Sequence, residues 1–232
     1  LTEPWACVTA SYDVFYRAGW KADGMALIAA GPAAAGVDYR MGTPYAGGQP
    51  PRCVVTMGVG GALLDELRRR AKSDGVSLIE LGAPSAESLE QAKKACNEGA
   101  FDDVVLLGAD AALYEMLEPL AGKGGVLNLV GAEGLQGAAQ VDVGRLHYDN
   151  LSLTGTADRD LSLAYEPIRT ELLPRGKAAF LGAAGPMGQM HVQRALQAQD
   201  GPSLAVATDL LPDRLQVIAV KFAQLIEARR GQ

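Results

Sequence analysis

Cysteine and histidine are scarce in this sequence of 232 residues, which contains three cysteines and two histidines. Cys7, Cys53 and Cys96 lie far apart, and none belongs to a Cys-x-x-Cys pair. An odd number of widely separated cysteines indicates neither a disulfide framework nor a zinc-ribbon site. We therefore expect a reducing, cytoplasmic location and no metal site formed by this chain.

Long hydrophobic runs and an excess of basic residues are also missing. No apolar run approaches the length of a membrane span, and no signal-like segment opens the sequence. The net charge of −6, from 27 acidic and 21 basic residues, argues against a nucleic-acid surface. We expect neither a membrane nor a nucleic acid among the partners. Because the sequence begins at Leu1 rather than at methionine, we also expect a longer parent protein.

Three catalytic signatures are absent. There is no Gly-Lys-Ser/Thr, which a P-loop requires, and no Gly-x-Ser-x-Gly nucleophile elbow. None of the seven tyrosines has a lysine four residues later, so the Tyr-x-x-x-Lys pair of short-chain reductases is missing as well. Nucleotide hydrolysis, ester hydrolysis and short-chain reduction are therefore disfavoured. The catalytic residues stay unassigned.

The most informative stretch that is present covers residues 179–188, Ala-Phe-Leu-Gly-Ala-Ala-Gly-Pro-Met-Gly. An apolar strand stops at a turn of small residues, and a helix-compatible segment begins at Pro186. Gly185 lets the backbone approach a ligand, and Gly188 lets the helix pack close to the strand. The free N–H groups of such a helix attract phosphate. We predict a cofactor-binding turn formed by Gly182, Gly185, Pro186, Met187 and Gly188. A strand–turn–helix whose glycines serve only packing stays open.

A carboxylate follows at the expected distance. The apolar segment 204–208 ends at Asp209, about 20 residues beyond Gly188, the spacing at which dinucleotide sites hold the ribose 2′-hydroxyl. The same carboxylate would repel a 2′-phosphate. The sequence therefore predicts NAD or NADP as the cofactor, with NAD preferred. A methyltransferase could use the same glycine turn and acid.

Residues 26–36, Ala-Leu-Ile-Ala-Ala-Gly-Pro-Ala-Ala-Ala-Gly, repeat this pattern. The similarity extends to a tyrosine before each turn and to an apolar strand after it, which indicates an internal repeat. Gly31 is the candidate cofactor-binding residue of this turn, but Ala34 replaces the last glycine and Met57 replaces the acid. We therefore expect the second repeat to bind a dinucleotide better than the first.

Strands and helices are expected to alternate along most of the chain, which predicts parallel β-α-β units. The fold class is α/β, a doubly wound parallel sheet in the order 3-2-1-4-5-6, followed by a second, incomplete Rossmann-like repeat. We expect domains at 1–156 and 157–232. Expected strands are 25–30, 53–56, 77–80, 103–107, 125–130, 150–154, 177–181 and 204–208. Expected helices are 3–17, 60–72, 85–96, 111–120, 158–173, 186–197 and 212–229.

Ordered short blocks in residues 3–156 resemble the coenzyme domain of medium-chain, zinc-type dehydrogenases. The first block, Glu-Pro-Trp-Ala-Cys-Val at 3–8, is similar to the segment that leads into that domain. The later blocks follow the order seen in the sorbitol and sorbose-phosphate branch. They are Gly-Trp-Lys at 19–21, Gly-Pro at 31–32, Val-Val-Thr at 54–56, Phe-Asp-Asp-Val at 101–104, Gly-Val-Leu-Asn at 125–128, His-Tyr at 147–148 and Thr-Gly-Thr at 154–156.

The resemblance implies the coenzyme-binding portion of an NAD(P)-dependent oxidoreductase acting on a small alcohol, a polyol or a sugar phosphate. In that family the catalytic zinc is held by an N-terminal domain absent from this sequence, and Glu3 alone matches a position near the metal. The family also pairs its sixth strand across a two-fold axis, so we expect a homo-oligomer. The alternative is a non-catalytic, degenerate Rossmann module that serves assembly. We expect His191 and Arg194 to form a capped or packed surface pair, with contact of one of them to a phosphate or a substrate anion as the alternative. We expect Met187 and Met190 to fill the core.

Overall fold

The chain is described by a computed structural model at residues 2–12, 17–42, 49–95, 99–165 and 171–230. It forms two compact units. The six-stranded unit is Tyr16–Pro167, and the two-stranded unit combines Leu1–Phe15 with Ile168–Gln232. The sequence placed residues 2–12 with the first sheet, whereas the structure groups these described residues with the two-stranded unit.

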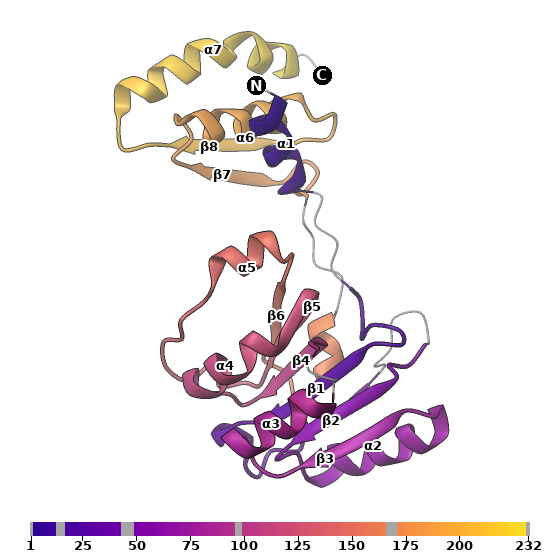
Figure 1. The fold of residues 1–232 in the computed structure, drawn as a ribbon. Coiled ribbons are helices and arrows are strands. Elements are labelled where there is room, and N and C mark those ends of the chain that lie inside the picture. The colour runs from indigo at the N-terminus through magenta and orange to yellow at the C-terminus, as the bar shows by residue number, and fades with distance from the viewer. Residues whose placement is uncertain (1, 13–16, 43–48, 96–98, 166–170, 231–232) are drawn as a thin grey trace. The chain divides into compact units, whose positions relative to one another are not determined.

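The six-stranded unit alternates strands and helices (Figure 1). Its strands are β1 (Met25–Ala30), β2 (Cys53–Met57), β3 (Ser77–Leu81), β4 (Phe101–Leu107), β5 (Ala121–Val130) and β6 (Ser152–Thr156). Its α-helices are α2 (Gly61–Asp74), α3 (Ala86–Ala95), α4 (Ala111–Leu117) and α5 (Val143–Tyr148). Its described residues also form the 3₁₀ helices η1 (Pro32–Ala34), η3 (Glu118–Leu120) and η4 (Leu161–Tyr165).

The predicted sheet is confirmed. Its strand order is β3-β2-β1-β4-β5-β6, and every neighbouring pair is parallel. Because β1 pairs with both β2 and β4, the strand order reverses there, and loops on either side of β1 diverge at the carboxyl edge. That divergence is where doubly wound sheets bind ligands.

Both faces of this sheet are covered, as short apolar runs in parallel strands require. Leu27, Val55 and Val104 face a core closed by α3 and α4. Ile28, Val54 and Val105 face the opposite core, closed by α2, by η4 and by Trp20. The sheet is therefore the middle of three layers.

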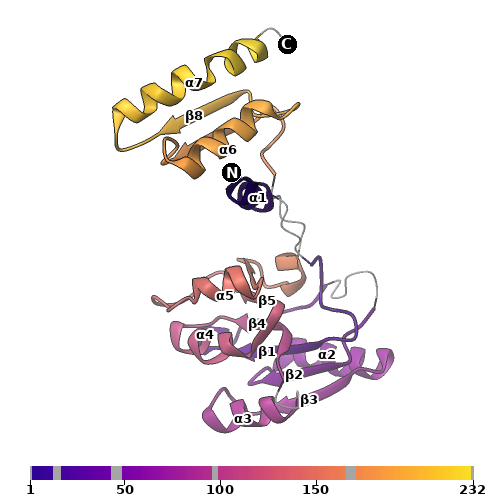
Figure 2. The ribbon, with the colours of Figure 1, turned by 45° about the horizontal axis from the view of Figure 1, so that its top comes forward.

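The two-stranded unit contains α1 (Thr2–Ala10), β7 (Lys177–Leu181), α6 (Pro186–Gln197), β8 (Leu204–Thr208) and α7 (Pro212–Arg230). Strands β7 and β8 are parallel, with Phe180 opposite Ala207. These two residues pack with α6 and α7 around Ala183, Val192 and Phe222. The helices α6 and α7 also contact each other, and α1 lies against α6 (Figure 2).

Three expected elements differ. The helix predicted over 158–173 appears as η4 alone; residues 171–176 are not helical, and 166–170 lie outside the described residues. The helix predicted over 3–17 ends at Ala10, and its residues 13–16 also lie outside the described part. The sequence missed α5, which begins at Val143 behind the N-capping side chain of Asp142. Among the described residues, no helix combines the length and hydrophobicity needed to cross a bilayer.

Candidate functional site

The turn of the second repeat joins β7 directly to a well-formed helix. Gly182 has a φ of 68°, a left-handed conformation that favours glycine, and α6 then begins with Pro186. The helix has 12 residues and its N-cap, Gly185, provides no side-chain cap. The first N–H groups of any helix have no acceptor within it, so the amides of Met187 and Gly188 are left for another partner.

Asp209 lies at this turn and is held by two backbone donors. Its Oδ2 accepts a hydrogen bond from Ala184 N at 3.1 Å, and its Oδ1 accepts one from Leu211 N at 3.1 Å. The carboxylate therefore connects the end of β8 to the glycine turn. Each carboxylate oxygen retains acceptor capacity for a further hydroxyl group.

Two glycines of the turn have different steric roles. A Cβ on Gly188 would overlap the Gly182 carbonyl oxygen and come within 2.7 Å of Ala183 Cα. The expected packing role of Gly188 is thus confirmed. A Cβ on Gly185 would meet only the Gly182 carbonyl oxygen, at 3.5 Å. Packing alone does not require glycine at position 185, which leaves its space open to a ligand.

The expected packed pair on α6 is present and includes a third residue. Tyr12 Oη and His191 Nδ1 are 3.0 Å apart, and the Arg194 guanidinium stacks over the Tyr12 ring at 4.1 Å. Arg194 also donates to both carboxylate oxygens of Glu171. Burial and the Arg194 charge lower the pKa of His191. The expectation for Met187 is wrong, because its side chain is 41% exposed on the first turn of α6.

The corresponding turn of the first repeat is closed by its own chain. Only the three residues of η1 follow Gly31, so no α-helix begins there. Ala33 N donates to the Gly108 carbonyl oxygen at 3.1 Å, and a Cβ on Gly31 would lie 2.5 Å from that oxygen. The loop after β4 thus uses the donors and the space that a pyrophosphate would need. Met57, at the position of the acid, is fully buried.

A cavity of about 390 Å³ nevertheless lies beside this first turn at the carboxyl edge of the sheet. Its walls include Gly31, Tyr39, Gly58, Gly60 and Pro84. Gly58 and Gly61 have φ values of 64° and 62°, and the segment Gly-Val-Gly-Gly at 58–61 opens α2. Sequence reasoning missed this cavity, although a glycine-rich segment directly after the second strand was a readable signal.

The described residues contain no cluster of three or more histidine, cysteine, aspartate or glutamate side chains that could hold a metal ion. Glu3, the residue expected near a metal in the parent, is exposed on α1 and accepts a weak hydrogen bond from Cys7 Sγ at 3.6 Å. Partial desolvation and the Glu3 carboxylate raise the pKa of Cys7. Cys7 therefore lacks the features of an activated thiolate.

No family model matches this chain, and no curated protein matches it. Its structural neighbours include a cobalt- and zinc-bound thermostable alcohol dehydrogenase from Pyrobaculum aerophilum (17% identity, TM-score 0.34; 86% of this chain, 52% of that one). They also include 2R,3R-butanediol dehydrogenase from Bacillus subtilis (11% identity, TM-score 0.36; 86% and 54%). L-idonate 5-dehydrogenase from Escherichia coli is a third (15% identity, TM-score 0.32; 86% and 53%).

The chain thus spans about half the length of these structures. These proteins are alcohol and polyol dehydrogenases, and the similarity does not confirm the expected sorbitol branch. At these identities and TM-scores, the similarity assigns neither a substrate nor a residue role to this chain.

Proposed function

We propose that this chain is the coenzyme-binding portion of an NAD(P)-dependent oxidoreductase and that it binds the dinucleotide at the turn of the two-stranded unit. The observation that carries the proposal is the junction of β7, α6 and Asp209. There, the left-handed Gly182 precedes the N-terminus of an uncapped 12-residue helix, and the Asp209 carboxylate accepts a hydrogen bond from Ala184 of the same turn. The pyrophosphate would accept hydrogen bonds from Met187 N and Gly188 N, and Asp209 would accept them from the ribose hydroxyls.

The preference for NAD follows from charge. Asp209 can accept a hydrogen bond from a 2′-hydroxyl, but it would repel the 2′-phosphate of NADP. The substrate class, a small alcohol or polyol, rests on the resemblance of residues 3–156 to zinc-type dehydrogenases. In such enzymes the zinc belongs to a domain absent from this sequence, so we expect this chain alone to bind cofactor without turning over an alcohol.

Calorimetric titration of the whole chain tests the proposal. Asp209→Asn removes the charged acceptor and should weaken NAD binding by about 1.5–3 kcal/mol, which is tenfold or more in Kd. It should also reduce the discrimination against NADP. The control is Gly60→Asp, which places a negative charge in the cavity of the six-stranded unit. Gly60 has extended backbone angles and no atom within 4 Å of its Cβ position. Binding that is lost in Gly60→Asp and unchanged in Asp209→Asn would contradict the proposal.

A second candidate function concerns the six-stranded unit, which we propose is a degenerate module that serves assembly. The hydrogen bond from Ala33 N to the Gly108 carbonyl and the burial of Met57 favour it. The cavity beside Gly31 instead favours the opposite alternative, in which the first repeat binds the dinucleotide. The Gly60→Asp titration separates the two.

A further inference from the structure

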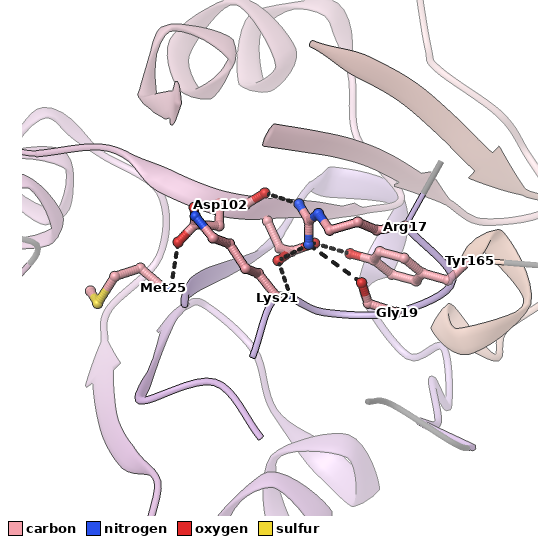
Figure 3. A network of polar contacts seen from close by, with 7 residues as sticks. Arg17, Gly19, Lys21, Met25, Asp102 and Tyr165 are labelled. Carbon is pink, nitrogen blue, oxygen red and sulfur yellow. Dashed lines mark hydrogen bonds and ion pairs between the residues drawn. The ribbon is translucent and has the colours of Figure 1, made fainter. Parts of the chain in front are cut away.

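A buried carboxylate lies on the six-stranded unit at the edge opposite the cavity beside Gly31. Asp103 is 1% exposed and lies near the amino end of β4, opposite Ala26 of β1 and Val126 of β5. Its two oxygens accept hydrogen bonds from Arg17 Nη1 at 2.9 and 2.8 Å. They also accept one from Lys21 N and one from Tyr165 Oη, both at 3.0 Å (Figure 3).

The neighbouring Asp102 strengthens one side of this network. Its backbone carbonyl accepts from Arg17 Nη2 at 2.6 Å, and its carboxylate accepts from Lys21 Nζ at 2.6 Å and from Met25 N at 2.9 Å. Residues 17–25 are thereby fixed along the start of β4 (Figure 3).

The other side is fixed by η4. Tyr165 is 4% exposed, and Leu161 of the same 3₁₀ helix is fully buried in the core that contains Ile28 and Val105. The phenol thus reaches Asp103 from an element that is itself packed on the sheet.

The positions of these partners in the chain give the network its significance. The six-stranded unit runs from Tyr16 to Pro167. Arg17 directly follows its first residue, and Tyr165 lies two residues before its last. One carboxylate therefore holds the chain where it comes into the unit and where it leaves it, although these residues are far apart in sequence.

We propose that Asp103 is a shared latch for the two segments through which the chain connects this unit to the other, so that loosening either segment loosens both. A carboxylate buried to this extent keeps its charge only while its donors stay in place. Losing Arg17 or Tyr165 admits water or a proton to Asp103, and either change weakens its remaining hydrogen bonds. Burial already raises the pKa of Asp103, against the opposing effect of Arg17.

Hydrogen exchange of the full chain tests the latch with amides on both segments. Lys21, Asp23 and Gly24 report on the first, and Leu161 and Leu163 report on the second, since the amides of all five donate hydrogen bonds. Tyr165→Phe keeps the ring and removes the hydroxyl group. We expect exchange at Lys21, Asp23 and Gly24 to rise about tenfold or more, as for loss of a hydrogen bond to a charged group.

The reciprocal variant is Arg17→Met, with Arg17→Lys as the milder change if Arg17→Met does not fold. It should raise exchange at Leu161 and Leu163. Tyr148→Phe is the matched control, since Tyr148 is 83% exposed, and it should alter neither segment. Unchanged exchange at Val54 and Val55 of β2 would show that the sheet stays folded. If each variant speeds exchange only on its own segment, the two segments are anchored independently and the latch is refuted.

Discussion

At the scale of single residues, the two repeats use equivalent positions in opposite ways. Asp209 follows β8 and stays accessible beside a helix N-terminus, whereas Met57 ends β2 as a core residue. Packing requires glycine at position 188, and the Gly108 backbone fills the space beside Gly31. The same sequence pattern therefore leads to a candidate ligand site in one repeat and to a closed turn in the other.

Thr154 offers a test of burial cost in the six-stranded unit. Its Oγ1 is buried and has no hydrogen-bond partner among the described residues. Thr154→Val should raise the free energy of unfolding by about 1 kcal/mol because it removes an unsatisfied polar group. Urea unfolding followed by Trp20 fluorescence in a Trp5→Phe background measures this.

Thr156→Val is the matched control for that change. Thr156 Oγ1 accepts a hydrogen bond from Asp158 N at 3.1 Å, so Thr156→Val should not raise the free energy of unfolding. A stability loss in Thr154→Val that matches the loss in Thr156→Val would show that Thr154 has a partner.

Tyr165 should make the six-stranded unit sensitive to alkaline pH. Burial, and then the Asp103 charge, raise the pKa of Tyr165 well above its usual value of about 10. The folded state thus holds this proton more tightly, so the associated stability is complete below pH 10 and is lost as pH rises beyond it. The slope is about 1.4 kcal/mol per pH unit.

Tyr165→Phe should remove that part of the slope. Burial also raises the pKa of Tyr39 and Tyr114, but both are present in the two proteins and cancel in the comparison. Urea unfolding of both proteins between pH 8 and about 11 measures the difference. Parallel stability profiles over this range would show that Tyr165 titrates normally.

At the scale of elements, the β7–α6 junction depends on the different roles of its glycines. Gly188→Ala should destabilise the two-stranded unit by about 1–3 kcal/mol, because the added methyl group overlaps the Gly182 carbonyl. Gly185→Ala should leave the stability of the unit unchanged, because Gly185 has room for a methyl group in the free protein. It should weaken NAD binding, because that methyl group would take up space proposed for the dinucleotide. Circular dichroism melts and NAD titrations of both variants measure this. Equal losses of stability in the two variants would contradict the assigned roles.

The sequence predicted most elements because their signals are local. Short apolar runs identified every strand of the sheet, and alternation with helices predicted its parallel order. The helix predicted over 158–173 was wrong at its C-terminal end, where Leu173 and Gly176 belong to a turn. The closure of the first turn by Gly108 and the network around Asp103 were not predictable, because each depends on contacts between distant residues.

At the scale of the whole molecule, the two repeats are not separated by a single boundary. The sequence placed the division after residue 156, since its pattern of helices and strands restarts at Asp158. In the structure, α1 precedes β1 in sequence but packs on α6, and η4 precedes β7 but packs on the six-stranded unit. The segment before each repeat therefore belongs to the unit of the other repeat, an arrangement that local sequence patterns do not encode.

We also predict that the chain self-associates through the two-stranded unit. One face of its sheet packs on helices, whereas on the other Leu181, Leu204 and Val206 are 83%, 49% and 45% exposed. Within the described residues, β7 and β8 pair only with each other, so each has an open edge. Sedimentation equilibrium should show concentration-dependent association that the Leu181→Lys, Val206→Lys double variant reduces.

Leu210→Lys is the control for that experiment, since Leu210 is 97% exposed but lies beyond the strand. It should leave association unchanged. A monomer at every concentration would contradict the prediction.

An amide NMR titration of the isotope-labelled chain with NAD reports residue by residue where the dinucleotide binds, and thus whether it binds at the β7–α6 turn. We predict shifts at Gly182, Ala184, Met187, Gly188 and Asp209, with the largest at Met187 and Gly188, whose N–H groups open α6. Asp209→Asn should reduce them at equal NAD concentration. Shifts confined to Gly31 and to residues 58–61 would place the dinucleotide in the six-stranded unit and contradict the account.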